Sequence, residues 1–109
     1  MANHLDSVFA AMADPTRRAV IERLLDGPAS VSDLHSDHDM AMPSFLKHIR
    51  KLEDAGLVTS RKTGRTRMIH IEAAPMRVAE DWLSRQRTLW EGRLDRLQAL
   101  ADALERTPQ

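Results

Sequence analysis

Four polar side chains spaced along one predicted helix could bind a polyanion. The segment covering residues 42–57, MPSFLKHIRKLEDAGL, places hydroxyl, ammonium and imidazole groups on one face: Ser44, Lys47, His48 and Lys51. Its apolar residues fall at i, i+4 and i+7 on the other face: Phe45, Ile49 and Leu52. Because helical side chains at these spacings stack on one another, the pattern predicts one face that packs in a core and one that carries positive charge.

Both ends of this helix are marked in the sequence. Pro43 suits a first helical turn, where its missing N–H would have no partner in any case. Gly56 follows Ala55 and allows the left-handed conformation that ends many helices. The sequence therefore predicts a short helix with defined ends.

The positive charge of the chain is concentrated in its middle third. The whole sequence has 16 basic and 16 acidic residues and a net charge of zero. Residues 42–70 contain two acidic residues, Glu53 and Asp54, against seven basic ones: Lys47, Arg50, Lys51, Arg61, Lys62, Arg65 and Arg67. This local excess predicts a surface for nucleic acid, which the neutral total would otherwise argue against.

Three helices are predicted before this segment. Residues 5–13 form a short amphipathic helix with the apolar positions Leu5, Val8, Phe9 and Met12. Asp14 and Pro15 are typical of an N-cap and first residue, and open a second helix whose inner face is Val20, Ile21, Leu24 and Leu25. Ser30 and Asp33 have capping-box spacing at the start of a third helix. Residues 30–57 thus hold two short helices separated by a polar break, which is the helix-turn-helix pattern.

After Gly56 the periodicity changes to that of strands. Two β-prone runs, residues 57–61 and 68–71, flank a basic connection, so residues 57–72 predict a hairpin with a basic tip. From Pro75 to about residue 106 the chain is again helical, a rod of roughly 45 Å that exceeds the width of so small a domain. The apolar residues of this rod need a partner: Trp82, Leu83, Leu89, Trp90, Leu94, Leu97, Leu100, Ala101 and Leu104.

Together these segments resemble the arsenic-repressor-type (ArsR/SmtB) family of winged helix-turn-helix transcriptional regulators. The resemblance covers about residues 5–72 and rests on ADPTRRAVIERLL, SVSDL, MPSFLKHIRKLEDAGLV and RKTGRTRMIHI, with the C-terminal helix agreeing in place and length. The combined motif is specific, whereas any one piece alone is weak. The run WLSRQRTLWEGRLDRL further resembles the branch of the family with long tryptophan-containing terminal helices.

The resemblance implies a mostly α fold with a small β-hairpin, that is, a winged helix-turn-helix with a long C-terminal dimerisation helix. It implies a single domain over residues 1–109, with dimerisation helices at 5–13 and 75–106, the helix-turn-helix at 30–57 and the wing at 57–72. Family members are homodimers that bind an imperfect palindrome in double-stranded DNA and block transcription. Their two recognition helices enter successive major grooves about one helical turn apart. The residues implied at the dimer interface are Leu5, Val8, Phe9, Met12, Trp82, Leu83, Leu89, Trp90, Leu94 and Leu97.

DNA-binding roles follow from the same resemblance. Ser44, Lys47 and His48 lie where the family's recognition helix meets bases and phosphates, and Arg50 and Lys51 suit phosphate. The wing would consist of Lys62, Arg65 and Arg67, for which phosphate contact is a commoner role than insertion into the minor groove. The alternatives are a merely solvated helix face and a solubilising hairpin tip.

Three positions depart from the family pattern. Ala41 stands where a capping serine is common, and Phe45 and Leu46 stand where small or hydroxyl residues are common. For Leu46, beside the DNA face, we expect contact with a thymine methyl group.

The sensor sites of the family are poorly matched. The cysteine pair of arsenic- and metal-responsive members is replaced by Ser30 and Ser32, whose hydroxyls do not substitute for thiolates with soft metals. His35 and His38 have the spacing of a chelating pair, so a metal-responsive repressor remains an alternative, although histidine is also ordinary in a polar turn. We therefore expect no metal and no cofactor. The inducing signal is then an organic small molecule or is absent.

No catalytic constellation is recognisable, so we expect a protein that is not an enzyme. The sequence has no cysteine, its first residues do not form an export signal, and no apolar run approaches the roughly 20 residues of a membrane helix. These features predict a cytoplasmic protein without a membrane partner. The alternative from another class is a winged-helix protein-interaction module that does not bind DNA.

Overall fold

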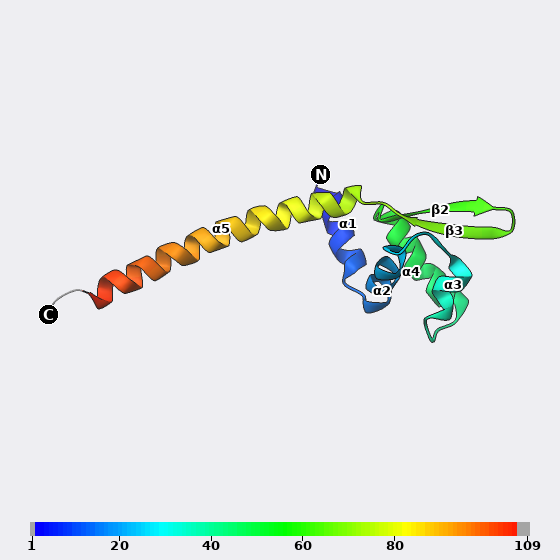
Figure 1. Ribbon diagram of the computed structural model, residues 1–109, viewed down its shortest axis with the longest axis horizontal. Helices are drawn as coiled ribbons and strands as arrows, with labels where there is room; N and C mark the ends of the chain where they lie inside the picture. Colours follow the sequence, from blue (N-terminus) through cyan, green and yellow to red (C-terminus); the bar gives the residue numbers. More distant parts are fainter. Residues whose placement is uncertain (1, 107–109) are drawn as a thin grey trace. The chain divides into compact units, whose positions relative to one another are not determined.

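The computed structural model describes residues 2–106, with side chains from residue 5 onward (Figure 1). The chain divides into two compact units, residues 1–79 and 80–109. The first unit contains α1 (Ala2–Met12), α2 (Pro15–Leu24), β1 (Ala29–Ser30), α3 (Val31–Ser36), α4 (Met42–Asp54), β2 (Val58–Thr63) and β3 (Thr66–Ile71). The last helix, α5 (Ala74–Glu105), begins in the first unit and continues through the second. The predicted winged helix-turn-helix fold is therefore confirmed.

The core of the first unit is built from one apolar face of each of its elements. The largest fully buried side chains are Phe45, Leu24, Leu34, Ile49, Leu52, Leu57, Ile69, Val8, Val20 and Val58. Each such burial contributes about 1.5–3 kcal/mol relative to an exposed side chain. Three of these residues come from α4, so the helix that carries the basic face is held by the centre of the core.

Two helices begin at side-chain caps that the sequence predicted. The backbone N–H of Arg17 donates to Asp14 Oδ2 over 3.0 Å at the start of α2. The backbone N–H of Asp33 donates to Ser30 Oγ over 3.0 Å at the start of α3. At α4 the N-cap is Ala41, which makes no side-chain cap, and Pro43 lies in the first turn.

The prediction that Leu25 lies on the inner face of α2 was wrong. The helix ends at Leu24, and Leu25 is its C-cap with 70% of its surface exposed. Gly27 follows with a φ of 130°, which turns the chain away. Helical periodicity does not show where a helix stops. At the end of α2, Leu24 is buried and Leu25 is not.

Gly56 ends α4 as predicted. Its φ is 74°, and its N–H donates to the Glu53 carbonyl over 2.9 Å while the N–H of Leu57 donates to the Leu52 carbonyl over 3.0 Å. These two bonds form a Schellman motif, in which a left-handed residue satisfies the last carbonyls of a helix. Leu52 and Leu57 are both buried beneath it, so the motif fixes the direction in which β2 leaves α4.

The wing is an antiparallel sheet in the order β1-β3-β2. Its hairpin strands are longer and its turn is tighter than expected, because Thr63 pairs with Thr66 and only Gly64 and Arg65 lie between them. Gly64 has a φ of 64°, which suits a two-residue hairpin turn. The sequence did not predict β1, because two residues give no periodic signal. Pairing with Ile69 and Met68 on β3 creates this strand.

The helix α5 has 32 residues and extends over almost the whole segment predicted for it. Pro75 and Ala79, near its start, are buried. None of the described helices combines the length and the apolar composition that a membrane-spanning segment requires.

Candidate nucleic-acid interface

The outer face of α4 carries the exposed polar residues that the sequence predicted for DNA. Phe45, Ile49 and Leu52 are at most 1% exposed, so they fix which side of the helix points outward. The exposed residues on the remaining surface include Ser44, Lys47, Arg50 and Lys51. In the described part of the chain, no acidic side chain forms an ion pair with these three cations.

Lys51 lies apart from the first turn of α4. With Asp54 and Ala55 it borders a shallow hollow whose other wall is α1, at Ser7, Ala10 and Ala11. Lys51 therefore lies beside α1, whereas Ser44 and Lys47 lie closer to the start of α4. This position suits a flanking phosphate better than a base edge.

Leu46 occupies a mixed environment. It is partly buried and packs against the core cluster. Much of its side chain thus contributes to packing, which leaves less of it for the thymine contact expected from the sequence.

The turn between α3 and α4 is organised around Phe45. The ring of His35 lies 5.4 Å from the Phe45 ring in a tilted arrangement, and that of His38 lies 5.5 Å away in a stacked one. His35 Nε2 also lies 2.7 Å from the Met40 carbonyl oxygen, which can only accept, so this nitrogen carries the proton. The large aromatic residue that departs from the family pattern is therefore accommodated by two histidines of the turn.

These contacts bear on the alternative of a metal at His35 and His38. A metal ion on His35 Nε2 would have to displace the hydrogen bond to Met40. Among the side chains described, no group of three or more His, Asp or Glu residues could hold a metal ion. At the start of α3, Ser30 Oγ serves as a helix cap.

His48 is held inside a polar cluster with α2. Its Nδ1 lies 3.1 Å from Arg17 Nη1 and 3.6 Å from Asp14 Oδ2. Partial burial raises the pKa of Asp14, but the hydrogen bond from the Arg17 N–H and the attraction of nearby positive charge, including the Arg17 guanidinium, outweigh it and lower the pKa below its ordinary 3.8. The His48 side chain is 22% exposed, so it lies between the core and the outer face.

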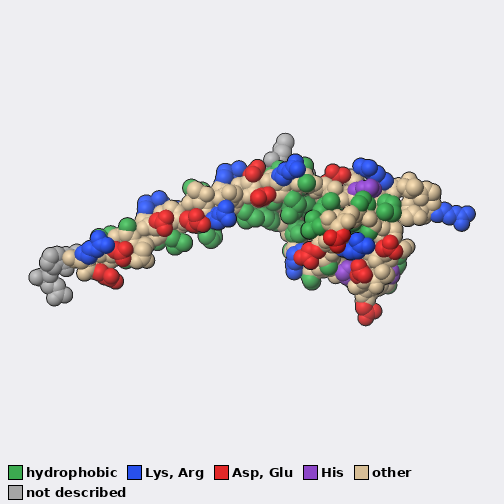
Figure 2. All heavy atoms as spheres, viewed as in Figure 1, with side chains coloured by type: hydrophobic (Ala, Val, Ile, Leu, Met, Phe, Trp, Pro, Cys, Tyr) green, Lys and Arg blue, Asp and Glu red, His purple; other side chains and the backbone are tan. Residues whose placement is uncertain are grey.

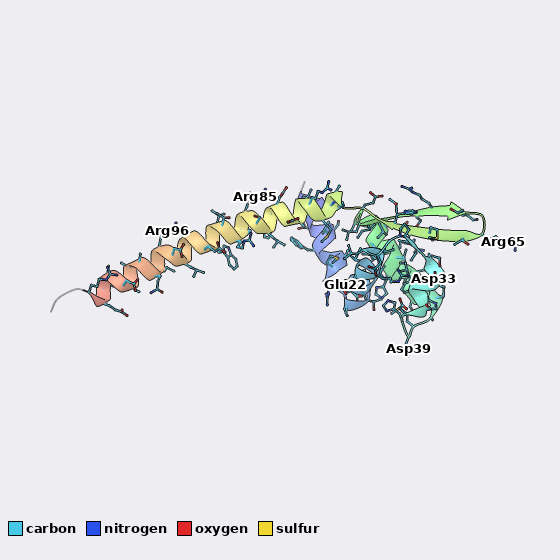
Figure 3. All side chains as sticks on the ribbon, in the orientation of Figure 1. Glu22, Asp33, Asp39, Arg65, Arg85 and Arg96 are labelled. Carbon is cyan, nitrogen blue, oxygen red and sulfur yellow. The ribbon has the colours of Figure 1, made fainter. Side chains whose placement is uncertain are left out.

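The three cations predicted for the wing lie in different environments. Arg65 lies at the tip of the hairpin (Figure 3). Lys62 and Arg67 are directly opposite on paired strands, which places two like charges side by side. Arg67 Nη2 donates to Glu53 Oε1 on α4 over 2.8 Å, and Ser60 Oγ donates to the same oxygen over 3.1 Å. Arg67 therefore joins the wing to α4, whereas Lys62 and Arg65 remain exposed without an ion pair in the described chain.

Sequence reasoning missed two residues of this surface. Arg17 and Glu53 contact predicted site residues on other elements, 31 positions away in one case and 14 in the other. No local pattern encodes such contacts. The capping position of Asp14 was the local signal that polar side chains gather at the start of α2.

The residues predicted for a dimer interface differ in accessibility. On α1, Phe9 is 37% exposed and Leu5 and Met12 are partly buried, but Val8 is 1% exposed and belongs to the core of its own chain. On α5, a stripe of exposed apolar side chains contains Trp82, Leu83, Leu89, Trp90, Leu94, Leu97, Leu100 and Leu104. Hydrophobic atoms gather along one edge of this helix in Figure 2, and Arg85 and Arg96 project from the other edge in Figure 3.

Comparisons with known proteins agree with this geometry. The helix-turn-helix domain family matches residues 12–61. A crystal structure of an ArsR family transcriptional regulator is 50% identical, covers 84% of this chain and 94% of its own, and superposes with a TM-score of 0.80.

Two curated relatives are also transcription factors. The HTH-type transcriptional regulator Rv2034 of Mycobacterium tuberculosis is 37% identical over 67 residues, which are 62% of this chain and 63% of that protein. The transcriptional repressor SdpR of Bacillus subtilis is 23% identical over 79 residues, 72% of this chain and 88% of its own. The match thus spans less than two thirds of the mycobacterial regulator and most of the other.

Proposed function

This chain belongs to the ArsR family of transcriptional regulators, and we propose that it acts as a homodimeric repressor that binds an imperfect palindrome in a promoter. This proposal rests on exposed cations of α4 and the hairpin that form no ion pair within the described chain, among them Lys47, Arg50, Lys51, Lys62 and Arg65. Because DNA carries one phosphate charge about every 1.7 Å of its axis, such a set favours binding to the duplex.

Within this proposal the residues have different roles. Lys47 and Ser44, near the start of α4, contact base edges and neighbouring phosphates in the major groove. Arg50 and Lys51 contact phosphates, and Lys62 and Arg65 of the wing contact the backbone beyond the groove. His48 and Arg67 already bond to other elements, His48 to Arg17 on α2 and Arg67 to Glu53 on α4, so they are less available to DNA than the exposed lysines.

The apolar stripe of α5 supports self-association. Burying an apolar side chain stabilises an assembly by about 25 cal/mol per Å² of surface removed from water. Eight large side chains exposed along one helix would bury considerable apolar surface between two copies. We propose that Trp82, Leu83, Leu89, Trp90, Leu94 and Leu97 meet a second copy, with Phe9, Leu5 and Met12 of α1 adding to the contact. Two copies then present two α4 helices to successive major grooves.

The relative SdpR is a transcriptional repressor, which supports repression rather than activation as the function of this chain. A bound dimer would block polymerase at the promoter. Promoter binding takes place where the chromosome is, so we propose that the protein works in the cytoplasm. An organic inducer that releases the DNA is compatible with this scheme.

The test is a fluorescence anisotropy titration with promoter DNA from upstream of its own gene, at several salt concentrations. We expect log affinity to fall linearly with log salt, with a slope of about −0.9 per phosphate contacted. The double substitution Lys47→Ala with Lys51→Ala should weaken binding and flatten that slope. Its charge-matched control is Arg85→Ala with Arg96→Ala on α5, which should leave the slope unchanged.

Two outcomes would overturn the proposal. Salt-insensitive or undetectable DNA binding would favour the winged-helix protein-interaction module instead. Equal losses in the two double variants would remove the outer face of α4 from the interface.

A further inference from the structure

The guanidinium group of Arg17 bonds to two other helices at once. Its Nε donates to the Ala11 carbonyl over 2.6 Å, and its Nη2 donates to the Ala10 carbonyl over 3.1 Å. These carbonyls belong to the last turn of α1, where the helix dipole favours a cation. The Ala10 carbonyl also accepts from the Ala13 N–H over 3.3 Å. The third nitrogen of Arg17, Nη1, lies 3.1 Å from His48 Nδ1 on α4.

This geometry favours one tautomer of the His48 ring. Arginine has donors and no acceptor, so Nδ1 must offer its lone pair to Nη1. In this tautomer the ring proton is on Nε2. Asp14 Oδ2, at 3.6 Å from Nδ1, is too far for a hydrogen bond to that nitrogen. Arg17 thus selects one tautomer of His48 and fixes the orientation of its ring.

We propose that Arg17 is a positioning residue that couples α1 to the DNA-binding face of α4 through His48. The inference rests on the proposed function. Arg17 holds His48 so that Nε2–H is a hydrogen-bond donor for an acceptor on DNA, and its two bonds to α1 transmit the position of that helix to α4. Because α1 also carries the exposed Phe9, Arg17 links the surface proposed for the second copy to the surface proposed for DNA.

The neighbouring residue Arg18 provides a matched control. Its Nη1 donates to the Met12 carbonyl over 2.8 Å, so it also binds the end of α1, but it makes no bond to α4 in the described chain. Arg17→Ala and Arg18→Ala therefore remove the same charge and each remove bonds to the end of α1. They differ in the contact with His48 and in the number of bonds to α1, which is two for Arg17 and one for Arg18.

The first experiment measures promoter-DNA affinity of the full chain for Arg17→Ala, Arg18→Ala, His48→Ala and the double variant Arg17→Ala with His48→Ala. We expect Arg17→Ala to weaken binding on the order of tenfold and Arg18→Ala by less than about twofold. The salt slope should stay unchanged in both, because neither arginine is proposed to touch phosphate. The double variant should bind no more weakly than the weaker single variant, since the two residues act as a unit.

The second experiment reads the tautomer directly. Nitrogen-15 NMR of the His48 ring should show protonated Nε2 and unprotonated Nδ1 in the unsubstituted protein, and a mixture of tautomers in Arg17→Lys. Arg17→Lys keeps the charge but lacks the planar fork that reaches three acceptors. It also serves as the folded substitute should Arg17→Ala fail to fold, and we expect it to bind DNA as weakly as Arg17→Ala.

The outcomes separate this inference from the proposed function. Additive losses in the double variant, equal losses in Arg17→Ala and Arg18→Ala, or a proton on Nδ1 would overturn the role of Arg17 while DNA binding stood. Failure of the unsubstituted protein to bind DNA would overturn the proposed function and the coupling together.

Discussion

Arg67 and Glu53 join the wing to α4 through a 2.8 Å contact between Nη2 and Oε1. The two side chains are 48% and 29% exposed, so water screens the pair and its contribution to stability is about 0–1 kcal/mol. The pair matters mainly because it fixes where Arg67 lies. Glu53, on the helix proposed to contact DNA, binds this cation of the wing.

We therefore expect Glu53→Gln to strengthen DNA binding. The substitution releases Arg67 and removes a negative charge from the proposed interface, so affinity should rise several-fold and the salt slope should steepen by about 0.9 for each phosphate gained. Asp54→Asn removes the same charge from the next position, where no ion pair exists in the described chain, and should leave Arg67 engaged. Equal effects of the two variants would show that only net charge matters.

Asp14 should make the stability of the fold depend on pH in the acid range. A carboxyl whose pKa is lower in the folded chain stabilises the fold above its unfolded value, and this stability is lost as the pH falls through the folded pKa. The unfolding free energy should therefore decline below pH 3.8, the ordinary value of Asp14, and this component should be absent in Asp14→Asn. Denaturant titrations between pH 2 and 7 measure the difference, and parallel curves for the two proteins would contradict it.

Asp14→Ala separates the cap from the charge. Asparagine still accepts the N–H bond of a helix cap, whereas alanine cannot, so Asp14→Ala should cost about 1 kcal/mol more than Asp14→Asn at neutral pH. Equal stability of the two variants in the same titrations would mean that the bond from Arg17 N to Asp14 contributes nothing measurable.

Phe45 should be the most costly position of α4 to truncate. It is 0% exposed and lies against both turn histidines, so Phe45→Ala should lower the unfolding free energy by about 3–5 kcal/mol. Leu25→Ala is the control, because Leu25 is 70% exposed and its loss should change stability by no more than about 0.5 kcal/mol. A large loss at Leu25 would contradict its assignment to the surface of the chain.

The stripe on α5 should control oligomeric state without controlling folding. Leu94→Glu with Leu97→Glu places two charges on that stripe, so we expect a monomer in sedimentation equilibrium with the helical circular dichroism of the first unit retained. Arg85→Ala with Arg96→Ala should leave the mass of the assembly unchanged. A charged stripe that still sediments as a dimer would exclude this face as the contact between copies.

Local rules predicted the elements because their signals lie within a few residues. The caps at Asp14 and Ser30, the first-turn Pro43 and the glycine stop at Gly56 each act over one turn of chain, and the structure confirms all four. The sequence misplaced Leu25 and missed β1 because these two features depend on contacts that are distant along the chain. The end of a helix and the pairing of a two-residue strand depend on what lies across the core.

The sequence by itself determined that a basic helix follows a short one and precedes a hairpin, because spacing and residue type suffice to define an amphipathic helix, its ends and a turn. Only the tertiary structure decided how the predicted cations are used. Lys47 and Arg65 stay exposed, whereas His48 bonds to Arg17 and Arg67 bonds to Glu53. The reason is distance along the chain: a side chain selects its partner among groups that folding brings within about 3 Å, and periodicity carries no information about groups 14 or 31 residues away.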